Sequence, residues 1–147
     1  MTAADRLIVA LDSTSPAQAL RQARAFRGLI RFVKIGSILF TAAGPQIIRR
    51  VKAMGFRVML DLKFHDIPHT VELSCRAAAA LGVSLLTVHA SGGPEMLAAA
   101  VRGVRAGAGR RKRPLVLGVT VLTSAEASGA LPRVLALPPT RHWDCQD

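Results

Sequence analysis

The stretch RVMLDLKFHDIPHTVELSCRAAAAL, residues 57–81, contains two kinds of periodicity in one short segment. It begins with an apolar run rich in branched residues, which is typical of a strand buried on both faces. A polar segment ends in Pro68, and the residues after it are rich in alanine and have helical spacing. Proline suits a first helical turn because its missing N–H would be unbonded there anyway. The stretch therefore predicts a strand, a turn and a helix, which together form one βα unit.

The same alternation extends in both directions and predicts five such units. The strands are expected at Arg6–Leu11, Arg31–Ile35, Arg57–Leu62, Ser84–His89 and Leu115–Val121. The helices are expected at Pro16–Arg27, Pro45–Met54, Pro68–Leu81 and Pro94–Ala106. A glycine follows each helix, as is common where the chain leaves a helix in the left-handed conformation; these are Gly28, Gly55, Gly82 and Gly107. Strands that alternate with helices predict an α/β fold with a parallel sheet.

Polar residues stand at or just beyond the end of each predicted strand. They are Asp12, Lys34, Asp61 with Lys63, His89, and Thr123 with Ser124. In a βα barrel the active site gathers at the carboxyl ends of the strands, so this distribution predicts a convergent polar cluster.

A doubly wound dinucleotide fold is the rival architecture, and it needs a glycine-rich first turn. The first turn here, residues 11–16, reads LDSTSP and has no glycine, which argues against a nucleotide cofactor. A complete barrel has eight strands and typically about 250 residues. The prediction is therefore a partial (β/α)8 barrel with about five βα units.

Asp61 and Lys63 are two residues apart on a predicted strand, so their side chains are expected on the same side. A carboxylate and an ammonium group in a poorly hydrated interior stay ionised through mutual attraction. Plainer interpretations also exist. Asp66 could cap the third helix, Asp12 and Lys34 could be ordinary strand-end charges, and His89 could be a core histidine.

The net charge of +11 raises the question of an anionic partner. The run GRRKRP, residues 109–114, could bind phosphate groups or could be a solvated loop. Aromatic residues make up 4% of the chain and tyrosine is absent, which favours the solvated loop and argues against nucleic-acid binding. No apolar run approaches the roughly 18 residues of a membrane span, and the N-terminus lacks the pattern of a signal peptide. The two cysteines, Cys75 and Cys145, suit a reducing compartment better than a disulfide scaffold, so the expected location is the cytoplasm. No membrane partner is expected.

The segment 61–70 resembles the DxKxxD motif of the orotidine monophosphate decarboxylase suprafamily, with Asp61, Lys63 and Asp66 at the motif positions. Four further segments resemble the decarboxylase branch, in order and at family spacing. They are LIVALD at 7–12, FVKIG at 32–36, VHASGG at 88–93 and VTVLTS at 119–124. The resemblance covers about residues 6–128 and implies conversion of orotidine 5′-phosphate to UMP and carbon dioxide in de novo pyrimidine synthesis.

The resemblance also implies roles for individual residues. Lys63 would be the general acid that protonates C6 of the pyrimidine, and Asp61 would face the substrate carboxylate. Asp12 and Lys34 would contact the ribose hydroxyls. The other implied substrate contacts are His89, Thr123 and Ser124 in the same subunit, and Asp66, Ile67 and Thr70 reaching into the neighbouring subunit of a homodimer. No metal or organic cofactor is implied, because lysine supplies the positive charge.

Two sister enzymes, 3-hexulose-6-phosphate synthase and 3-keto-L-gulonate-6-phosphate decarboxylase, share the motif but use magnesium. They have a glutamate near the end of the second strand, where this chain has Lys34. Lys34 therefore argues against a related sugar-phosphate lyase.

The family's phosphate-binding segments do not occur in residues 1–147, and the tail from about Leu131 does not resemble the family. We therefore divide the chain into a barrel part at residues 1–128 and an atypical tail at residues 129–147. A shifted reading frame or a truncated gene model would explain the tail. Three other functions remain as alternatives: a catalytically inactive remnant with an open sheet edge, a related sugar-phosphate lyase of the suprafamily, and a basic nucleic-acid-binding domain.

Overall fold

The computed structural model describes residue 4 and residues 6–122, and it has five parallel strands with helices between them. The strands are β1 (Ile8–Ala10), β2 (Phe32–Gly36), β3 (Arg57–Phe64), β4 (Leu85–His89) and β5 (Leu115–Val119). The helices are α1 (Pro16–Ala25), α2 (Ser37–Ala43), α3 (Gln46–Ala53), α4 (Pro68–Ala80) and α5 (Gly93–Ala108), with a 3₁₀ turn at Ala90–Gly92.

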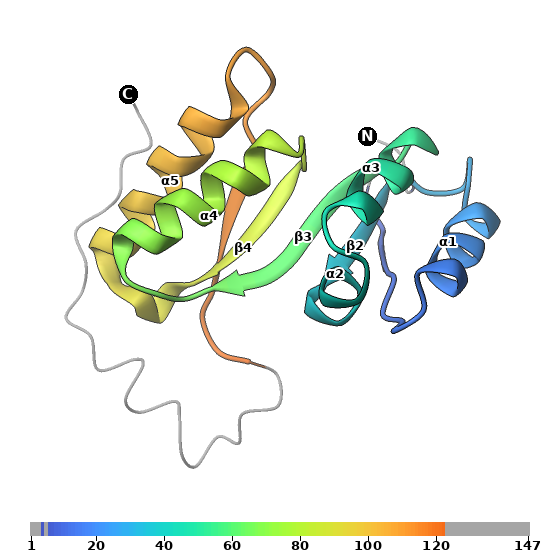
Figure 1. Cartoon of the computed structure of the whole chain (residues 1–147), viewed down its shortest axis with the longest axis horizontal. Helices are drawn as coiled ribbons and strands as arrows, with labels where there is room; N and C mark the ends of the chain where they lie inside the picture. The colour runs from blue at the N-terminus through green and yellow to red at the C-terminus, as the bar shows by residue number, and fades with distance from the viewer. Residues whose placement is uncertain (1–3, 5, 123–147) are drawn as a thin grey trace.

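The strands lie in the order β1-β2-β3-β4-β5, so each new strand is added to the same edge of the sheet (Figure 1). This order is that of a βα barrel, whereas a doubly wound sheet reverses direction part-way. In the described part of the chain β1 and β5 do not pair with each other, and the sheet is open. Leu115 on the β5 edge is 65% exposed. The predicted α/β architecture is therefore confirmed.

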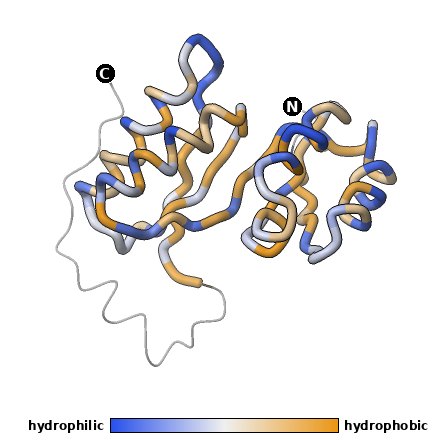
Figure 2. The backbone as a smooth tube through the Cα atoms, in the orientation of Figure 1, coloured by the Kyte–Doolittle hydropathy of each residue, from blue (hydrophilic) through white to orange (hydrophobic). Residues whose placement is uncertain are grey.

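The core lies between the sheet and the helices that cover it. Strand residues such as Val33, Ile35 and Leu60 are fully or almost fully buried against helical residues such as Leu20 and Ile48. Figure 1 shows α4 and α5 side by side next to β4, and α1 to α3 grouped around β1 and β2. Figure 2 shows the strands as largely hydrophobic and the connection after α5 as hydrophilic. No helix in this part of the chain is long and apolar enough to cross a membrane.

Three of the four predicted helix-ending glycines do have positive φ, but Gly107 does not. Gly107 lies inside α5, which continues to Ala108 and is followed by Gly109 at φ 56°. A Cβ on Gly107 would collide with the carbonyl oxygen of Arg76 in α4, and one on Gly103 with that of Glu72. These glycines are therefore needed for the close approach of the two helices, and the prediction for Gly107 was wrong.

The sequence pattern does not predict α2. This helix has seven residues, begins directly after Gly36 and ends before Gly44 at φ 62°. A segment of seven residues spans about two helical turns, which is too short to show helical periodicity in the sequence. An isolated helix of this length would also be unstable, because nucleation is unfavourable. It forms here because Leu39 is fully buried in the core.

The basic connection after α5 is exposed, as a solvated loop would be, but Arg111 has a structural role within it. Its guanidinium donates hydrogen bonds to the carbonyl oxygens of Ala80 at 2.9 Å, Gly107 at 3.2 Å and Ala108 at 3.3 Å. Lys52 donates to the neighbouring carbonyl of Leu81 at 3.0 Å. Cations near helix C-termini satisfy carbonyls that lack intrahelical partners. The run is thus an exposed loop in which Arg111 also binds helix carbonyls, a contact that the sequence pattern did not predict.

Candidate active site

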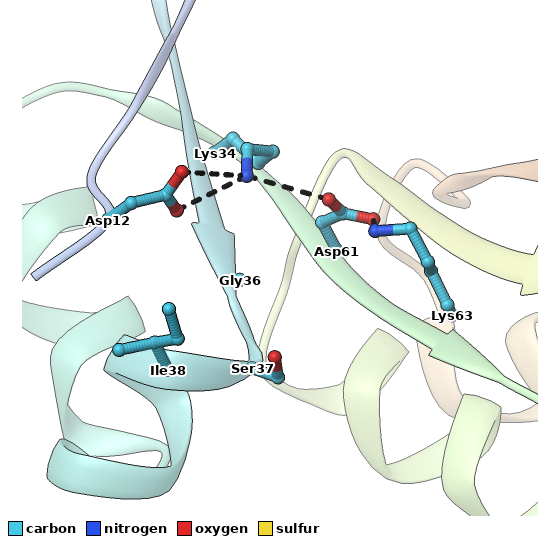
Figure 3. Close-up of a pocket in the computed structure, with 7 residues that line it drawn as sticks. All are labelled: Asp12, Lys34, Gly36, Ser37, Ile38, Asp61 and Lys63. Carbon is cyan, nitrogen blue, oxygen red and sulfur yellow. Dashed lines mark hydrogen bonds and ion pairs between the residues drawn. The ribbon is translucent and has the colours of Figure 1, made fainter. Parts of the chain in front are cut away.

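Four charged side chains meet at the carboxyl ends of three neighbouring strands. Asp12 follows β1, Lys34 lies on β2, and Asp61 and Lys63 lie on β3. With Gly36, Ser37 and Ile38 they line a cavity of about 160 Å³ (Figure 3). Parallel strands place their carboxyl ends at one edge of a sheet, so residues far apart in the sequence are brought together there.

The charges alternate in sign along a continuous chain of contacts, which we call the charge array. Lys34 Nζ lies 3.2 Å from Asp12 Oδ1 and 3.6 Å from Asp61 Oδ2. Lys63 Nζ lies 2.9 Å from Asp61 Oδ1. Figure 3 shows Lys34 between the two carboxylates and Lys63 on the far side of Asp61. Each oxygen of Asp61 thus faces a different ammonium group.

Strand β3 is irregular where it carries the array. Leu60 pairs with Leu86 and Phe64 with Val88, so residues 61–63 of β3 lie opposite the single residue Thr87 of β4. Lys63 has φ 50°, in the left-handed region that a lysine rarely adopts. The side chains of Asp61 and Lys63 do meet, as predicted. They meet at a bulge, however, and not by the regular alternation from which the prediction was made.

Asp61 is the most enclosed of the four charged side chains, at 11% exposed. Burial acts to raise the pKa of its carboxyl. Hydrogen bonds from Lys63 and Thr87, together with the attraction of the Lys63 and Lys34 ammonium groups, outweigh burial and place the pKa below its ordinary value of 3.8. Asp61 is therefore a carboxylate at neutral pH.

Sequence reasoning missed four residues of the site: Gly36, Ser37, Ile38 and Thr87. A Cβ on Gly36 would lie 3.4 Å from Asp12 Oδ1 and 3.6 Å from Lys34 Nζ, so this residue lies directly beside the array. Ser37 and Ile38 begin the helix that was not predicted. Thr87 was detectable, because it is a polar residue within the otherwise apolar run of β4 before His89.

Of the other predicted site residues, the four that the structure describes do not line the cavity. Asp66, Ile67 and Thr70 are exposed, and Ile67 is 65% exposed. His89 is half-buried and packs against His65, with ring centroids 5.1 Å apart. Thr123 and Ser124 lie outside the described residues.

The interpretation of Asp66 as a helix cap was wrong. Helix α4 begins at Pro68, and its N-cap residue is Ile67. Among the described residues, the carboxylate of Asp66 accepts only the N–H of Ile67, at 2.7 Å, and it makes no side-chain capping bond to the helix. Ile67 at the N-cap position has an apolar side chain that cannot accept a hydrogen bond, and Asp66 lies one residue too early to be the N-cap.

In the described part of the chain, no group of three or more His, Cys, Asp and Glu residues is placed to hold a metal ion. Cys75 is fully buried, and burial raises the pKa of its thiol to about 11. The thiol is therefore protonated at neutral pH and is a poor nucleophile.

A family model described as orotidine 5′-phosphate decarboxylase / HUMPS family matches residues 5–132. The chain belongs to this family. It is 53% identical over 138 residues to the orotidine 5′-phosphate decarboxylase of Synechococcus sp. strain WH7803, a match that covers 91% of this chain. The chain spans 55% of the length of that curated relative.

Solved structures agree with the observed fold. The crystal structure of orotidine 5′-phosphate decarboxylase from Lactobacillus acidophilus matches with a TM-score of 0.73 at 41% identity, and the match covers 80% of this chain and 54% of that chain. An uncharacterized conserved protein from Geobacillus kaustophilus matches with a TM-score of 0.77 at 44% identity, covering 82% and 56% of the two chains. A match to about half of a decarboxylase confirms the prediction of a partial barrel.

Proposed function

We propose that this chain supplies the reacting residues of an orotidine 5′-phosphate decarboxylase, which converts orotidine 5′-phosphate to UMP and carbon dioxide. The observation that carries the proposal is the charge array at the edge of the cavity. Two carboxylates and two ammonium groups alternate there, with contacts between 2.9 and 3.6 Å. Charged groups are costly to desolvate, so their presence together beside a cavity favours a catalytic role over a purely structural one.

In this proposal Lys63 donates a proton to C6 of the pyrimidine. The bond between C6 and the carboxylate carbon breaks, its electron pair stays on C6, and carbon dioxide leaves. The pair then takes a proton from Lys63 Nζ, and solvent returns the proton to the lysine. The ammonium group stabilises the charge that develops on C6 and is already held in place by Asp61 at 2.9 Å.

The neighbouring charges have complementary roles in the proposal. Asp61 stands beside the substrate carboxylate, and the repulsion between the two is relieved as neutral carbon dioxide forms. Asp12 and Lys34 bind the ribose hydroxyls, one as acceptor and the other as donor. His89, Thr123 and Ser124 complete the substrate contacts. The reaction uses no metal ion or organic cofactor, because lysine supplies the positive charge.

The proposal includes a cytoplasmic homodimer with shared active sites. Its support is the position of Asp66, Ile67 and Thr70, which are exposed at the start of α4 and do not line the cavity of their own chain. In a symmetric dimer, one surface of this kind can reach the cavity of the second subunit.

The test is turnover of orotidine 5′-phosphate, followed by the loss of its ultraviolet absorbance, in two proteins. One is the 147-residue chain. The other is a chimera in which residues 133–147, which lie beyond the family match, are replaced by the C-terminal part of the Synechococcus WH7803 relative that follows the aligned counterpart of residue 132. We expect turnover by the chimera, and little or none by the isolated chain, because binding energy from the remote phosphate group holds the substrate for reaction.

Lys63→Ala in the chimera should abolish turnover, while the matched control Lys112→Ala, in the exposed connection after α5, should retain it. A mixture of the inactive Lys63→Ala and Asp66→Ala chimeras should regain activity, because one site of each mixed dimer would be intact. A folded chimera without activity, or one that keeps its activity after Lys63→Ala, would contradict the proposal. Turnover by the isolated chain would show that the remaining segments are not needed.

A further inference from the structure

Thr87 is a buried polar residue directly behind the charge array. It lies on β4 and is 2% exposed. Its two chain neighbours, Leu86 and Val88, are fully buried apolar residues. Valine has nearly the same shape as threonine and would satisfy packing at this position, so the hydroxyl requires a separate explanation.

The hydroxyl makes two hydrogen bonds whose directions are fixed by chemistry. The N–H of Lys63 can only donate, and it lies 2.9 Å from Thr87 Oγ1. Thr87 therefore uses a lone pair for Lys63 and donates its single proton to Asp61 Oδ1, also at 2.9 Å. One hydroxyl thus joins the backbone of Lys63 to the side chain of Asp61.

The first of these bonds, from the Lys63 N–H to Thr87 Oγ1, lies at the β3 bulge. Residues 61–63 lie opposite Thr87 alone, so the regular ladder is interrupted there. A buried N–H without a partner is unfavourable, and the left-handed conformation of Lys63, at φ 50°, is unfavourable for a residue with a Cβ. The Thr87 hydroxyl accepts the N–H of Lys63 in this conformation and so stabilises it.

The second bond fixes the carboxylate. Asp61 Oδ1 accepts from both Thr87 and Lys63, which leaves Oδ2 facing Lys34 at 3.6 Å. Rotation of the carboxyl group would break the Thr87 bond and disturb both ion pairs. The orientation of the whole array therefore depends on one group that does not itself line the cavity.

We propose that Thr87 is a positioning residue, whose hydroxyl holds the Lys63 backbone in its bulge conformation and the Asp61 carboxylate between the two lysines. The role in turnover rests on the proposed decarboxylase function, whereas the structural role can be tested without it. Reactive groups act efficiently when neighbouring hydrogen bonds fix their rotamers.

The test compares Thr87→Val, which removes the hydroxyl but keeps the shape, with Thr87→Ser, which keeps the hydroxyl. Thr41→Val, at an exposed position on α2, is the matched control. Two NMR measurements on the 147-residue chain report on the two bonds. Hydrogen exchange of the Lys63 amide reports on the first, and a pH titration of the Asp61 carboxyl carbon reports on the second.

Thr87→Val should speed exchange of the Lys63 amide by about tenfold or more and should move the Asp61 titration to higher pH. Thr87→Ser and Thr41→Val should leave both close to the values of the unmodified chain. In a protein that turns over orotidine 5′-phosphate, Thr87→Val should lower kcat by about tenfold with little change in KM, and Thr87→Ser should restore kcat.

Unchanged Lys63 exchange and Asp61 titration in Thr87→Val would overturn the proposal, as would a failure of Thr87→Ser to restore them. If Thr87→Val does not fold, the unmodified chain still provides a test, because fast exchange of its Lys63 amide would show that the bond is absent. A lack of turnover in the unmodified protein would count against the decarboxylase function alone, since neither NMR measurement depends on turnover.

Discussion

Replacement of Asp61 by asparagine should destabilise the fold in a way that depends on pH. The carboxylate accepts hydrogen bonds from Lys63 and Thr87 at 2.9 Å and faces Lys34 at 3.6 Å, and it is 11% exposed. Removal of one partner from a fully buried pair costs about 3–5 kcal/mol, and exposed pairs contribute about 0–1 kcal/mol. Because Lys34 and Lys63 are 24% and 34% exposed, we expect an intermediate loss of about 1.5–3 kcal/mol.

The pH dependence follows from the direction of the pKa shift. The pKa of Asp61 is lower in the folded chain than its ordinary value of 3.8. The carboxylate therefore stabilises the fold fully above pH 3.8, and this contribution is lost as the pH falls through the lower, folded-state pKa. The difference in stability between the unmodified chain and Asp61→Asn should be constant from pH 7 to about pH 5 and should shrink in more acidic solution.

Urea denaturation at several pH values measures this difference. Asp66→Asn is the matched control, because Asp66 is exposed and, within the part of the chain that the structure describes, its carboxylate accepts only the N–H of Ile67. The control should cost about 1 kcal/mol or less. A loss for Asp61→Asn that is no greater than that of the control, or that stays the same at acidic pH, would refute the stabilising role of the array.

Two further predictions concern the packing of α4 against α5. Arg111→Ala should lower the unfolding free energy by about 1–2 kcal/mol, because carbonyls at both helix ends lose their donor, while Lys112→Ala in the same connection should change it by less than about 0.5 kcal/mol. Equal thermal stability of the two variants would contradict the role given to Arg111. Gly107→Ala should cost about 1–3 kcal/mol through its collision with Arg76, despite a gain of about 1 kcal/mol in helix propensity. A higher melting temperature for Gly107→Ala would show that the helices can separate at little cost.

Much of the fold could be predicted from local sequence. Runs of branched apolar residues indicated all five strands, and prolines such as Pro16 and Pro68 indicated where helices begin. The convergence of Asp12, Lys34 and Asp61 was also predictable, because it needs only parallel strands and a polar residue at each carboxyl end. The strands, the helix starts and the convergence of the strand-end residues depend on periodicity and topology, which can be predicted from sequence patterns.

The features that were missed depend on contacts between distant segments. Gly107 looks like a helix-ending glycine until Arg76 of α4 is placed against it. From the sequence, Arg111 is one residue of a basic run, and its hydrogen bond to the Ala80 carbonyl oxygen at 2.9 Å is seen only in the structure. Asp66 looks like a cap because the residues after it form a helix, yet the helix begins one residue later than a cap at Asp66 requires. In each case the deciding neighbour lies on another element or depends on an exact helix boundary.

The bulge in β3 shows why the detailed geometry of the site could not be read from the spacing of Asp61 and Lys63. A regular strand would bond its backbone N–H groups alternately to β2 and β4, and would direct the two side chains along the same face at the full separation of alternate residues. In the observed strand, the regular pairing with β4 is interrupted between Leu60 and Phe64, and Lys63 has φ 50°. With this backbone, Lys63 Nζ lies 2.9 Å from Asp61 Oδ1. Unfavourable local backbone persists only where surrounding contacts compensate for it, and here the compensating contact comes from Thr87, a side chain on the neighbouring strand. The geometry of the array is thus a property of two strands together, and substitutions on β4 should change it as surely as substitutions of the charged residues themselves.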